Sequence, residues 1–485
     1  MHVHIVAVAG TAMASLAGLL KDLGHDVSGS DVAFDPPMGP ALERWGVRCF
    51  RGFDAAHLDP APDLVVIGNV CRKDNPEARA AIDRGISYTH VAGALARFVL
   101  EQASPLVVAG THGKTTTTAL AAWLLDQTGF TPGFLIGGLP KNFDKSFRAP
   151  GPRRLSRPIA PGAPDRRSPF VIEGDEYDTA FFEKTAKFLH YRPEVAIVTS
   201  IEHDHVDIYP TLESYLDAFE KFVALVPEHG LVVANAADPL VVDVVSKAAR
   251  AEVAWFALEG EPTHGQAPHW FAAPAGSDSN GQAFDLYAGG VMAGRFALSM
   301  PGRHNLKNAV AAIGAAAQGY GAKLRELAPA LASFGGVRRR QDLIGTPRGI
   351  FVYDDFAHHP TAVRETLAAL RSRHGGGRLF AVFEPRSATA CRRMHQEEYA
   401  ASFDCADVTL LPPLGRTNLA PSEALDLGLL VTALRERGKE ASFLPDVDSI
   451  IDELARRVEP GDVIALLSNG AFGGIYEKLL ARLER

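Results

Sequence analysis

The stretch Val107-Val-Ala-Gly-Thr-His-Gly-Lys-Thr-Thr116 decides how this chain is organised. An apolar run ends at Gly110, the chain turns through Gly113, and Lys114 opens a segment with a helical pattern. Backbone N–H groups at such a turn point at one anion, and the positive end of the helix dipole lies behind them. The lysine charge and a threonine hydroxyl for Mg²⁺ complete a nucleotide phosphate site. A tight turn before a surface helix is the simpler alternative, but it would not need the threonines that follow the lysine. Val108 stands where the generic pattern has its first glycine, so we expect a shortened loop.

Composition narrows the class of protein. The 485 residues are enough for about three domains, and 47% hydrophobic and 22% charged residues are ordinary for globular proteins. A net charge of −8 argues against nucleic acid as a partner. The four cysteines show no C-x-x-C spacing, which is typical of a reducing cytoplasm. The apolar stretch 5–20 lacks a basic start and is too short to span a bilayer, so we expect a cytoplasmic protein that does not enter the membrane.

Short β-branched runs alternate with helical patterns, which predicts parallel sheets and an α/β fold. We expect three domains: a Rossmann-like domain over 1–102, a P-loop ATPase-like domain over 103–333, and a Rossmann-like domain over 334–485. The segment 149–169 holds six prolines and five arginines, and this composition predicts an exposed loop. The main expected strands are 2–8, 64–67, 170–173, 195–198, 231–234, 349–353, 378–383 and 463–467.

The first domain has the pattern of a nucleotide-binding half-sheet. Gly10 follows the first strand, and Gly29-Ser-Asp31 ends the second strand. In such a sheet a phosphate lies at the first helix N-terminus, and an acidic residue after the second strand contacts a ribose. Only Gly10 of the dinucleotide glycine fingerprint is present, so a dehydrogenase is not favoured.

Polar residues gather after the strands of the second domain, where ligands of open α/β sheets bind. Glu173 opens the acidic cluster that runs to Asp178, and a carboxylate there could reach a Mg²⁺ held by Thr115. A solvated acidic turn explains single members of this cluster, but not the whole of it. His203 and His205 flank Asp204 after the next strand, which suits either a metal site or proton handling.

Further candidates come from the second half of the chain. Gly302-Arg-His-Asn-Leu-Lys-Asn308 puts polar residues on one face of a helix start that could close over a nucleotide, although helix capping explains Asn305 alone. Arginines 338–340 could stabilise transferring phosphate charge, and Asp355 could bind a ribose hydroxyl. The forked guanidinium of Arg386 could bind a substrate carboxylate.

Taken in order, these motifs resemble the Mur ligase family of cytoplasmic peptidoglycan synthesis over essentially the whole chain. The resemblance implies an N-terminal domain for a UDP-sugar, a central ATPase domain, and a C-terminal domain that binds ATP and an amino compound. It also implies ATP-dependent amide formation through an acyl phosphate. The motifs that carry it are Gly110-Thr-His-Gly-Lys-Thr-Thr116, Glu173-Gly-Asp-Glu-Tyr-Asp178, Asp204-His205, His304-Asn305 to Asn308, Arg339-Arg340 and Asp354-Asp-Phe-Ala-His-His-Pro360.

The family pattern also implies roles for individual residues. Those with catalytic roles are Lys114, Glu173, His205 and Arg340. ATP would contact Gly110, Thr111, His112, Gly113, Lys114, Thr115, Thr116, Asn308, Arg340 and Asp355. Mg²⁺ ions would be held by Thr115, Glu173 and His205. The substrates would contact Gly10, Thr11, Met13, Ser30, Asp31, His358 and Arg386.

Within the family, the chain resembles the muramate-acting branch. Some members carry a carbamylated lysine where Phe219 stands, so that group is not carried over. The strings at 132–138, 176–182, 187–193, 384–387 and 468–474 resemble the recycling ligases that join L-alanyl-γ-D-glutamyl-meso-diaminopimelate to UDP-N-acetylmuramate. The alternatives are the L-alanine-adding branch and, from other classes, a P-loop ATPase or a nucleotide-sugar binding protein. His203 and the segment 149–169 depart from the family pattern.

Overall fold

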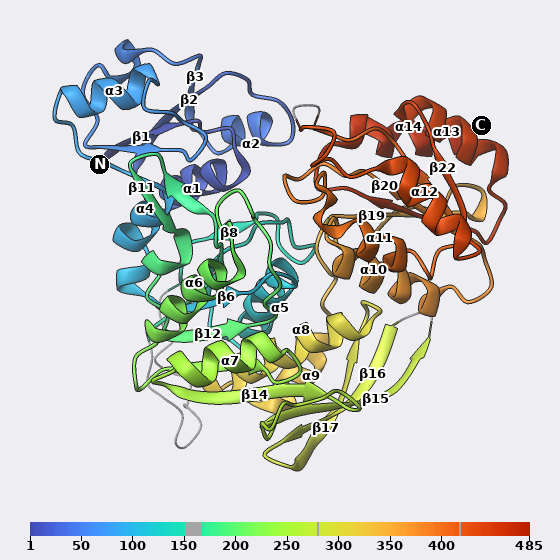
Figure 1. Ribbon diagram of the computed structural model, residues 1–485. Coiled ribbons are helices and arrows are strands. Elements are labelled where there is room, and N and C mark those ends of the chain that lie inside the picture. The colour runs from blue at the N-terminus through green and yellow to red at the C-terminus, as the bar shows by residue number, and fades with distance from the viewer. Residues whose placement is uncertain (152–166, 279–280, 417–418) are drawn as a thin grey trace.

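The computed structural model describes residues 1–151, 167–278, 281–416 and 419–485, and its three lobes surround a common centre (Figure 1). Each lobe is built on one main sheet, of five, ten and six strands in chain order. The expected α/β fold with parallel sheets is confirmed. The predicted domain limits, after 102 and after 333, fall between strands of different sheets and stay a prediction. Most of the segment 149–169 lies outside the described residues.

The first sheet is entirely parallel, in the order β3-β2-β1-β4-β5. Strand β1 ends two residues earlier than expected because Ala7 has a positive φ of 64°, which an extended strand cannot accommodate. The strands are β1 (His2–Val6), β2 (Asp26–Asp31), β3 (Arg48–Arg51), β4 (Leu64–Ile67) and β5 (Tyr88–Thr89). The helices are α1 (Thr11–Asp22), α2 (Met38–Arg44), α3 (Pro76–Asp83) and α4 (Val91–Phe98).

The second sheet has the order β17-β16-β15-β14-β13-β12-β6-β9-β7-β8. Its parallel centre was expected, but the antiparallel extension β15-β16-β17 was not. The two-residue turn Gly289-Gly290, with φ of 57° and 80°, joins β16 to β17 and is the hairpin signal in the sequence. The strands are β6 (Ser104–Ala109), β7 (Gly133–Leu135), β8 (Phe147–Arg148), β9 (Pro169–Gly174), β12 (Val195–Val198), β13 (Leu231–Asn235), β14 (Glu252–Leu258), β15 (Trp270–Asp278), β16 (Gly281–Ala288) and β17 (Val291–Leu298).

Two buried layers flank this second sheet. Helices α5 and α8 pack against each other, and their apolar residues join the side chains of one face of the sheet in a single core. The other face packs against helices that follow β12 and β13 and merges with the core of the first domain. The helices are α5 (Lys114–Gln127), α6 (Leu212–Ala224), α7 (Pro239–Ala248), α8 (Arg303–Gly314) and α9 (Leu324–Ala332), and a separate hairpin is formed by β10 (Asp178–Ala180) and β11 (Glu183–Ala186).

The third sheet has the order β18-β19-β23-β20-β21-β22, and only β18 runs antiparallel to its neighbour. The strands are β18 (Asp342–Gly345), β19 (Phe351–Asp355), β20 (Leu379–Phe383), β21 (Val408–Leu411), β22 (Glu440–Phe443) and β23 (Val463–Leu467). The helices are α10 (Pro360–Arg373), α11 (Gln396–Ser402), α12 (Leu427–Glu436), α13 (Val447–Arg457) and α14 (Ile475–Leu483). Among the described residues, none of the helices combines the length and apolar character needed to cross a bilayer.

This topology gathers the functional loops. Strands β9, β6 and β12 are parallel neighbours, so the loops after their carboxyl ends lie side by side at one edge of the second sheet. The segment before β18 approaches the same edge, because Arg340 donates a hydrogen bond to Thr115. The next residue, Gln341, donates its N–H to Asp355 at the end of β19, which therefore lies close by.

Candidate active site

The predicted phosphate loop has the backbone that its glycines require. Gly113 caps α5 with φ of 83°, and Gly110 has φ of 132°. A Cβ at Gly110 would lie 2.1 Å from the Thr199 hydroxyl, and a Cβ at Gly113 would lie 2.5 Å from the Asn308 side-chain oxygen. Both positions therefore exclude any side chain. The first N–H groups of a helix have no partner within the helix, so those at the start of α5 can bind an anion. Anion binding at this loop stays a prediction.

Lys114 is held by a buried carboxylate. Its Nζ donates to both carboxylate oxygens of Glu176, at 3.0 Å each, and to the Gly110 carbonyl at 2.6 Å. Burial alone would lower the pKa of the lysine, but the carboxylates of Glu176 and Asp175 raise it above its ordinary value. The lysine is therefore a fixed positive charge at the loop.

Glu176 is the centre of this network, although the motif analysis assigned it no individual role. Its Oε1 lies 3.2 Å from His205 Nε2 and accepts a hydrogen bond from the Tyr215 hydroxyl at 3.2 Å. Burial would raise its pKa, but Lys114 and His205 together lower it to about 2. In return, Glu176 and Asp204 raise the pKa of His205 against the effect of burial. His205 is therefore linked to Glu176 in this structure.

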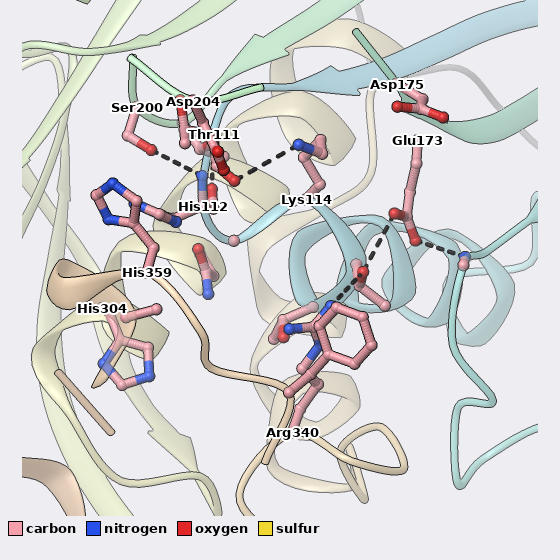
Figure 2. A pocket seen from close by; sticks show the side chains of 18 of the residues that line it. Thr111, His112, Lys114, Glu173, Asp175, Ser200, Asp204, His304, Arg340 and His359 are labelled. Atoms are coloured by element: carbon pink, nitrogen blue, oxygen red, sulfur yellow. Dashed lines mark hydrogen bonds between the residues drawn. The ribbon is translucent and has the colours of Figure 1, made fainter. Parts of the chain in front are cut away.

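Thr115, Glu173 and Arg340 form a second group at the start of α5. Glu173 and Arg340 are labelled in Figure 2. The Thr115 hydroxyl donates to Glu173 Oε2 at 3.1 Å, and Arg340 Nη2 donates to that hydroxyl at 3.0 Å. Burial raises the pKa of Glu173, although the Gly137 N–H and Arg340 act against it. Two hard oxygen donors beside a phosphate loop fit the preferences of Mg²⁺, and a bound cation would stabilise the ionised glutamate.

Residues of the third domain around Asp355 form a second wall of the site, in addition to the phosphate loop. Asp355 accepts hydrogen bonds from the backbone N–H groups of Gln341 and Ala357, at 2.7 Å each, while burial raises its pKa. The Gln341 side chain contacts His304 at 3.1 Å and accepts a hydrogen bond from Asn305 at 3.2 Å. The polar helix start predicted at 302–308 is thus the first turn of α8, and it faces this wall.

Other predicted positions have structural partners. His203 Nε2 donates to the Tyr209 carbonyl at 2.9 Å, which explains a histidine in place of an apolar residue. Phe219 is fully buried against Phe188 and Tyr215, so the position of the family's carbamylated lysine belongs to the apolar core here. Burial lowers the pKa of His358 to about 4.

A cavity of about 890 Å³ connects these groups. It is lined by residues of all three domains, from Thr11 on α1 to His358 before α10. Thirteen of the predicted site residues line it: Thr11, Thr111, His112, Gly113, Lys114, Thr115, Thr116, Glu173, His205, Asn308, Arg340, Asp355 and His358.

The remaining predicted positions do not line this cavity among the described residues: Gly10, Met13, Ser30, Asp31, Gly110 and Arg386. Met13 is buried in the core, and the Ser30 hydroxyl donates to the buried Glu77. Asp31 Oδ2 accepts the Ala9 N–H at 2.8 Å. The roles assigned to these residues, like those of the cavity residues, stay predictions.

Comparison with known proteins matches three stretches of the chain to domains of one family. Residues 2–102 match the Mur ligase family catalytic domain, residues 108–316 the Mur ligase middle domain, and residues 339–470 the glutamate ligase domain of Mur ligases. A UDP-N-acetylmuramate–L-alanyl-γ-D-glutamyl-meso-2,6-diaminoheptandioate ligase from Escherichia coli K12 is 39% identical over 100% of this chain and 99% of its own length. The chain belongs to the Mur ligase family. This confirms the family expected from the motifs and makes the protein an ATP-dependent ligase; Mg²⁺ stays a prediction.

Two further proteins are similar over the full chain. The crystal structure of a murein peptide ligase from Psychrobacter arcticus 273-4 superposes with a TM-score of 0.73 at 35% identity, covering 100% of this chain and 99% of that one. A UDP-N-acetylmuramate–L-alanine ligase from a Roseiflexus species is 34% identical over 100% of both chains. Solved Mur ligases thus share the three-domain fold described above.

Proposed function

We propose that this Mur ligase joins L-alanyl-γ-D-glutamyl-meso-diaminopimelate to UDP-N-acetylmuramate, with ATP and Mg²⁺, in the cytoplasmic recycling of peptidoglycan. The observation that carries the proposal is the single cavity that runs from α1, past the phosphate loop, to the wall formed by Asp355 and His358. A sugar nucleotide, ATP and an amine can meet there. Relatives named for this reaction are 39% and 35% identical over the whole chain.

The residues suit phosphoryl transfer to the muramate carboxylate. Lys114 and the N–H groups at the start of α5 would carry the charge of the phosphates, and Thr115 and Glu173 would hold Mg²⁺. Bound Mg²⁺ would neutralise phosphate charge during the transfer. The carboxylate oxygen attacks the terminal phosphorus of ATP, which gives an acyl phosphate and ADP. The peptide amine then attacks the acyl carbon, and phosphate leaves with the carbon–oxygen bond electrons.

Contacts between domains would shield this reaction from water. Arg340 of the third domain donates to Thr115 of the second, and the Thr389 hydroxyl donates to Asp204 Oδ1 at 2.6 Å. The Thr361 hydroxyl donates to Glu202 Oε2 at 2.8 Å. These contacts hold the third domain over the phosphate loop, where a hydrolysable acyl phosphate needs protection.

The decisive experiment measures phosphate release that depends on UDP-N-acetylmuramate, with the tripeptide and with free L-alanine as the amine. The proposal is supported if turnover with the tripeptide is at least about tenfold higher than turnover with alanine. A site that fits the larger substrate uses the additional contacts to stabilise the transition state. Turnover with alanine and none with the tripeptide would reject the substrate and leave the family intact.

The L-alanine ligase is the second candidate, because relatives with that name are 34% identical over the whole chain. The same assay distinguishes the two. A plain P-loop ATPase would consume ATP with neither sugar nucleotide nor amine present. A nucleotide-sugar binding protein would behave identically with and without Lys114.

A further inference from the structure

Two clusters of histidine and glutamate bring potential metal ligands together in the part of the chain that the structure describes. In each cluster the three ligand atoms lie within 4.8 Å of one another. Two imidazoles and one carboxylate form a ligand set that Zn²⁺ uses in proteins. The clusters are His90, Glu183 and His190, and His112, Glu202 and His359.

The first cluster is closed by its hydrogen bonds. The Gly93 N–H donates to His90 Nδ1 at 3.2 Å, so the proton of the neutral ring lies on Nε2. Nε2 then donates to Glu183 Oε2 at 3.1 Å. A metal at Nε2 would need the other tautomer, which would put two hydrogens between His90 and Gly93. This cluster is therefore a hydrogen-bonded junction between α4 and the β10–β11 hairpin.

The second cluster is open, in the sense that ring nitrogens of His359 are available to a metal ion. Both ring nitrogens of His359 lack a hydrogen-bond partner among the described residues, although only 6% of the side chain is exposed. His359 Nδ1 lies 3.4 Å from Glu202 Oε2, and His112 Nε2 lies 3.3 Å from the same oxygen. A buried polar group without a partner is costly, and a metal ion would satisfy it.

The charges in this second cluster favour a cation. Burial lowers the pKa of His359 to about 3, so its ring is neutral and offers a lone pair at neutral pH. Burial would raise the pKa of Glu202, but its contact with His112 lowers it to about 2, so the carboxylate is ionised. Thr361 donates to that carboxylate and orients it, as outer partners of metal ligands do.

The three side chains come from separate elements around the cavity. His112 lies in the phosphate loop before α5, Glu202 follows β12, and His359 caps α10 of the third domain. All three line the cavity, so an ion can enter from it. Figure 2 shows His112 and His359 beside each other, and their ring centroids are 4.8 Å apart.

We propose that His112, Glu202 and His359 form a Zn²⁺ site that joins the second and third domains, separate from the oxygen donors Thr115 and Glu173. Imidazole ligands select Zn²⁺ or Co²⁺ over Mg²⁺, which prefers oxygen. The cavity leaves room for a fourth ligand, such as water. Because the ion would bridge two domains, Zn²⁺ would hold them closed and slow product release. This site does not depend on which amine the ligase accepts.

The test uses the untagged full-length protein, stripped of metal and without substrates. It is titrated with Co²⁺ while visible absorption is recorded, since four-coordinate Co²⁺ absorbs far more strongly than the hydrated ion. About one equivalent should bind with this signature, and Zn²⁺, but not Mg²⁺, should displace it. Weak absorption that Mg²⁺ removes equally well would overturn the proposal.

Variants locate the site. Glu202→Gln keeps the side-chain volume, and it should weaken Co²⁺ binding by at least about tenfold, as should His359→Ala. His190→Ala, in the closed cluster, is the matched control and should bind as the unaltered protein does. Circular dichroism checks the fold of each variant. If His359→Ala does not fold, the Co²⁺ binding of Glu202→Gln decides the test. Unchanged binding in Glu202→Gln, or equal loss in His190→Ala, contradicts the site.

Discussion

Two turns in this ligase share one design, in which a strand leads through glycine into a helix, but they differ in chemistry. Gly10 precedes α1 with φ of −66°, and the nearest atom to a Cβ there is 3.9 Å away. Gly113 precedes α5 with φ of 83°, and its Cβ would collide with Asn308. The first turn therefore tolerates a side chain, whereas the second has a backbone that only glycine can adopt freely.

The turns also differ in charge. No lysine follows Gly10 directly, and the carboxylate of the neighbouring Asp31 accepts a hydrogen bond from the Ala9 N–H. Lys114 follows Gly113 directly and is charged by its contact with Glu176. A helix N-terminus alone can hold an anion, but phosphoryl transfer needs a fixed positive charge where negative charge develops. We therefore expect ligand binding without chemistry at the first turn and phosphoryl transfer at the second.

Removing the charge of the second turn should have the largest effect. Lys114→Ala should lower amide formation by about 10²–10³-fold or more, because a preorganised cation at the phosphates is lost. Affinity for UDP-N-acetylmuramate, measured by calorimetry, should stay close to that of the unaltered protein, since we expect the first domain to bind that ligand. Lys221→Ala on the exposed face of α6 is the control. Substantial amide formation by Lys114→Ala would end the proposed division between the turns.

Adding one methyl group to each turn tests the backbone difference. Gly113→Ala should lose about 1–3 kcal/mol of unfolding free energy, from positive φ and the contact with Asn308, and should bind ATP poorly. Gly10→Ala should change the unfolding free energy by no more than about 0.5 kcal/mol. Denaturant unfolding of both variants makes the comparison. Equal losses would mean that the two turns are constrained alike.

Changing Glu173, the proposed Mg²⁺ ligand beside the second turn, should have a smaller effect. Glu173→Gln should raise the Mg²⁺ concentration needed for half-maximal turnover by about tenfold or more, because a charged oxygen ligand becomes neutral. Asp178→Asn, whose carboxylate pairs with Lys184 and Asn69 away from Thr115, is the control. Identical Mg²⁺ dependence in Glu173→Gln and the control would remove Glu173 from the metal site.

The sequence predicted those features of the fold that depend on local pattern. Buried strands of continuous β-branched and apolar residues, such as 195–198 and 463–467, were predicted to the residue. The antiparallel strands β15–β17 were missed because their half-exposed residues make a weak pattern, even though Gly289-Gly290 marks the turn. Strand β1 ends early because of the unusual φ of Ala7, which no local pattern shows.

The sequence predicted the motifs of the candidate site, but not the contacts between their side chains. The sequence showed an acidic cluster, yet the choice of Glu176 as the partner of Lys114 depends on packing against His205 and Tyr215, far along the chain. The same holds for the contact between Glu202 and Thr361, which are 159 positions apart. Residue types at strand ends are local information, whereas the direction in which each side chain points is set by tertiary packing.

The smallest expected effect is a pH dependence confined to the second turn. The pKa of Glu176 is about 2 in the folded protein against an ordinary value of 4.5. A carboxyl with a lowered folded pKa adds stability above its unfolded pKa, and this stability is lost as the pH falls from about 4.5 towards 2. Glu176→Gln should reduce the slope of unfolding free energy in that window by up to about 1.4 kcal/mol per pH unit.

Two variants sharpen this last measurement. Gly10→Ala should keep the unaltered slope, because the substitution changes no ionisable group. Glu173→Gln should not reduce the acid slope either, since burial raises the pKa of Glu173, and stability from a raised pKa is lost as pH rises. Glu176→Gln will also be less stable at neutral pH, because Lys114 loses its partner, so the slope is the quantity to compare. If the unfolding free energy of Glu176→Gln depends on pH as steeply as that of the unaltered protein, the lysine is charged without help from Glu176. The electrostatic contrast between the two turns would then rest on Lys114 alone.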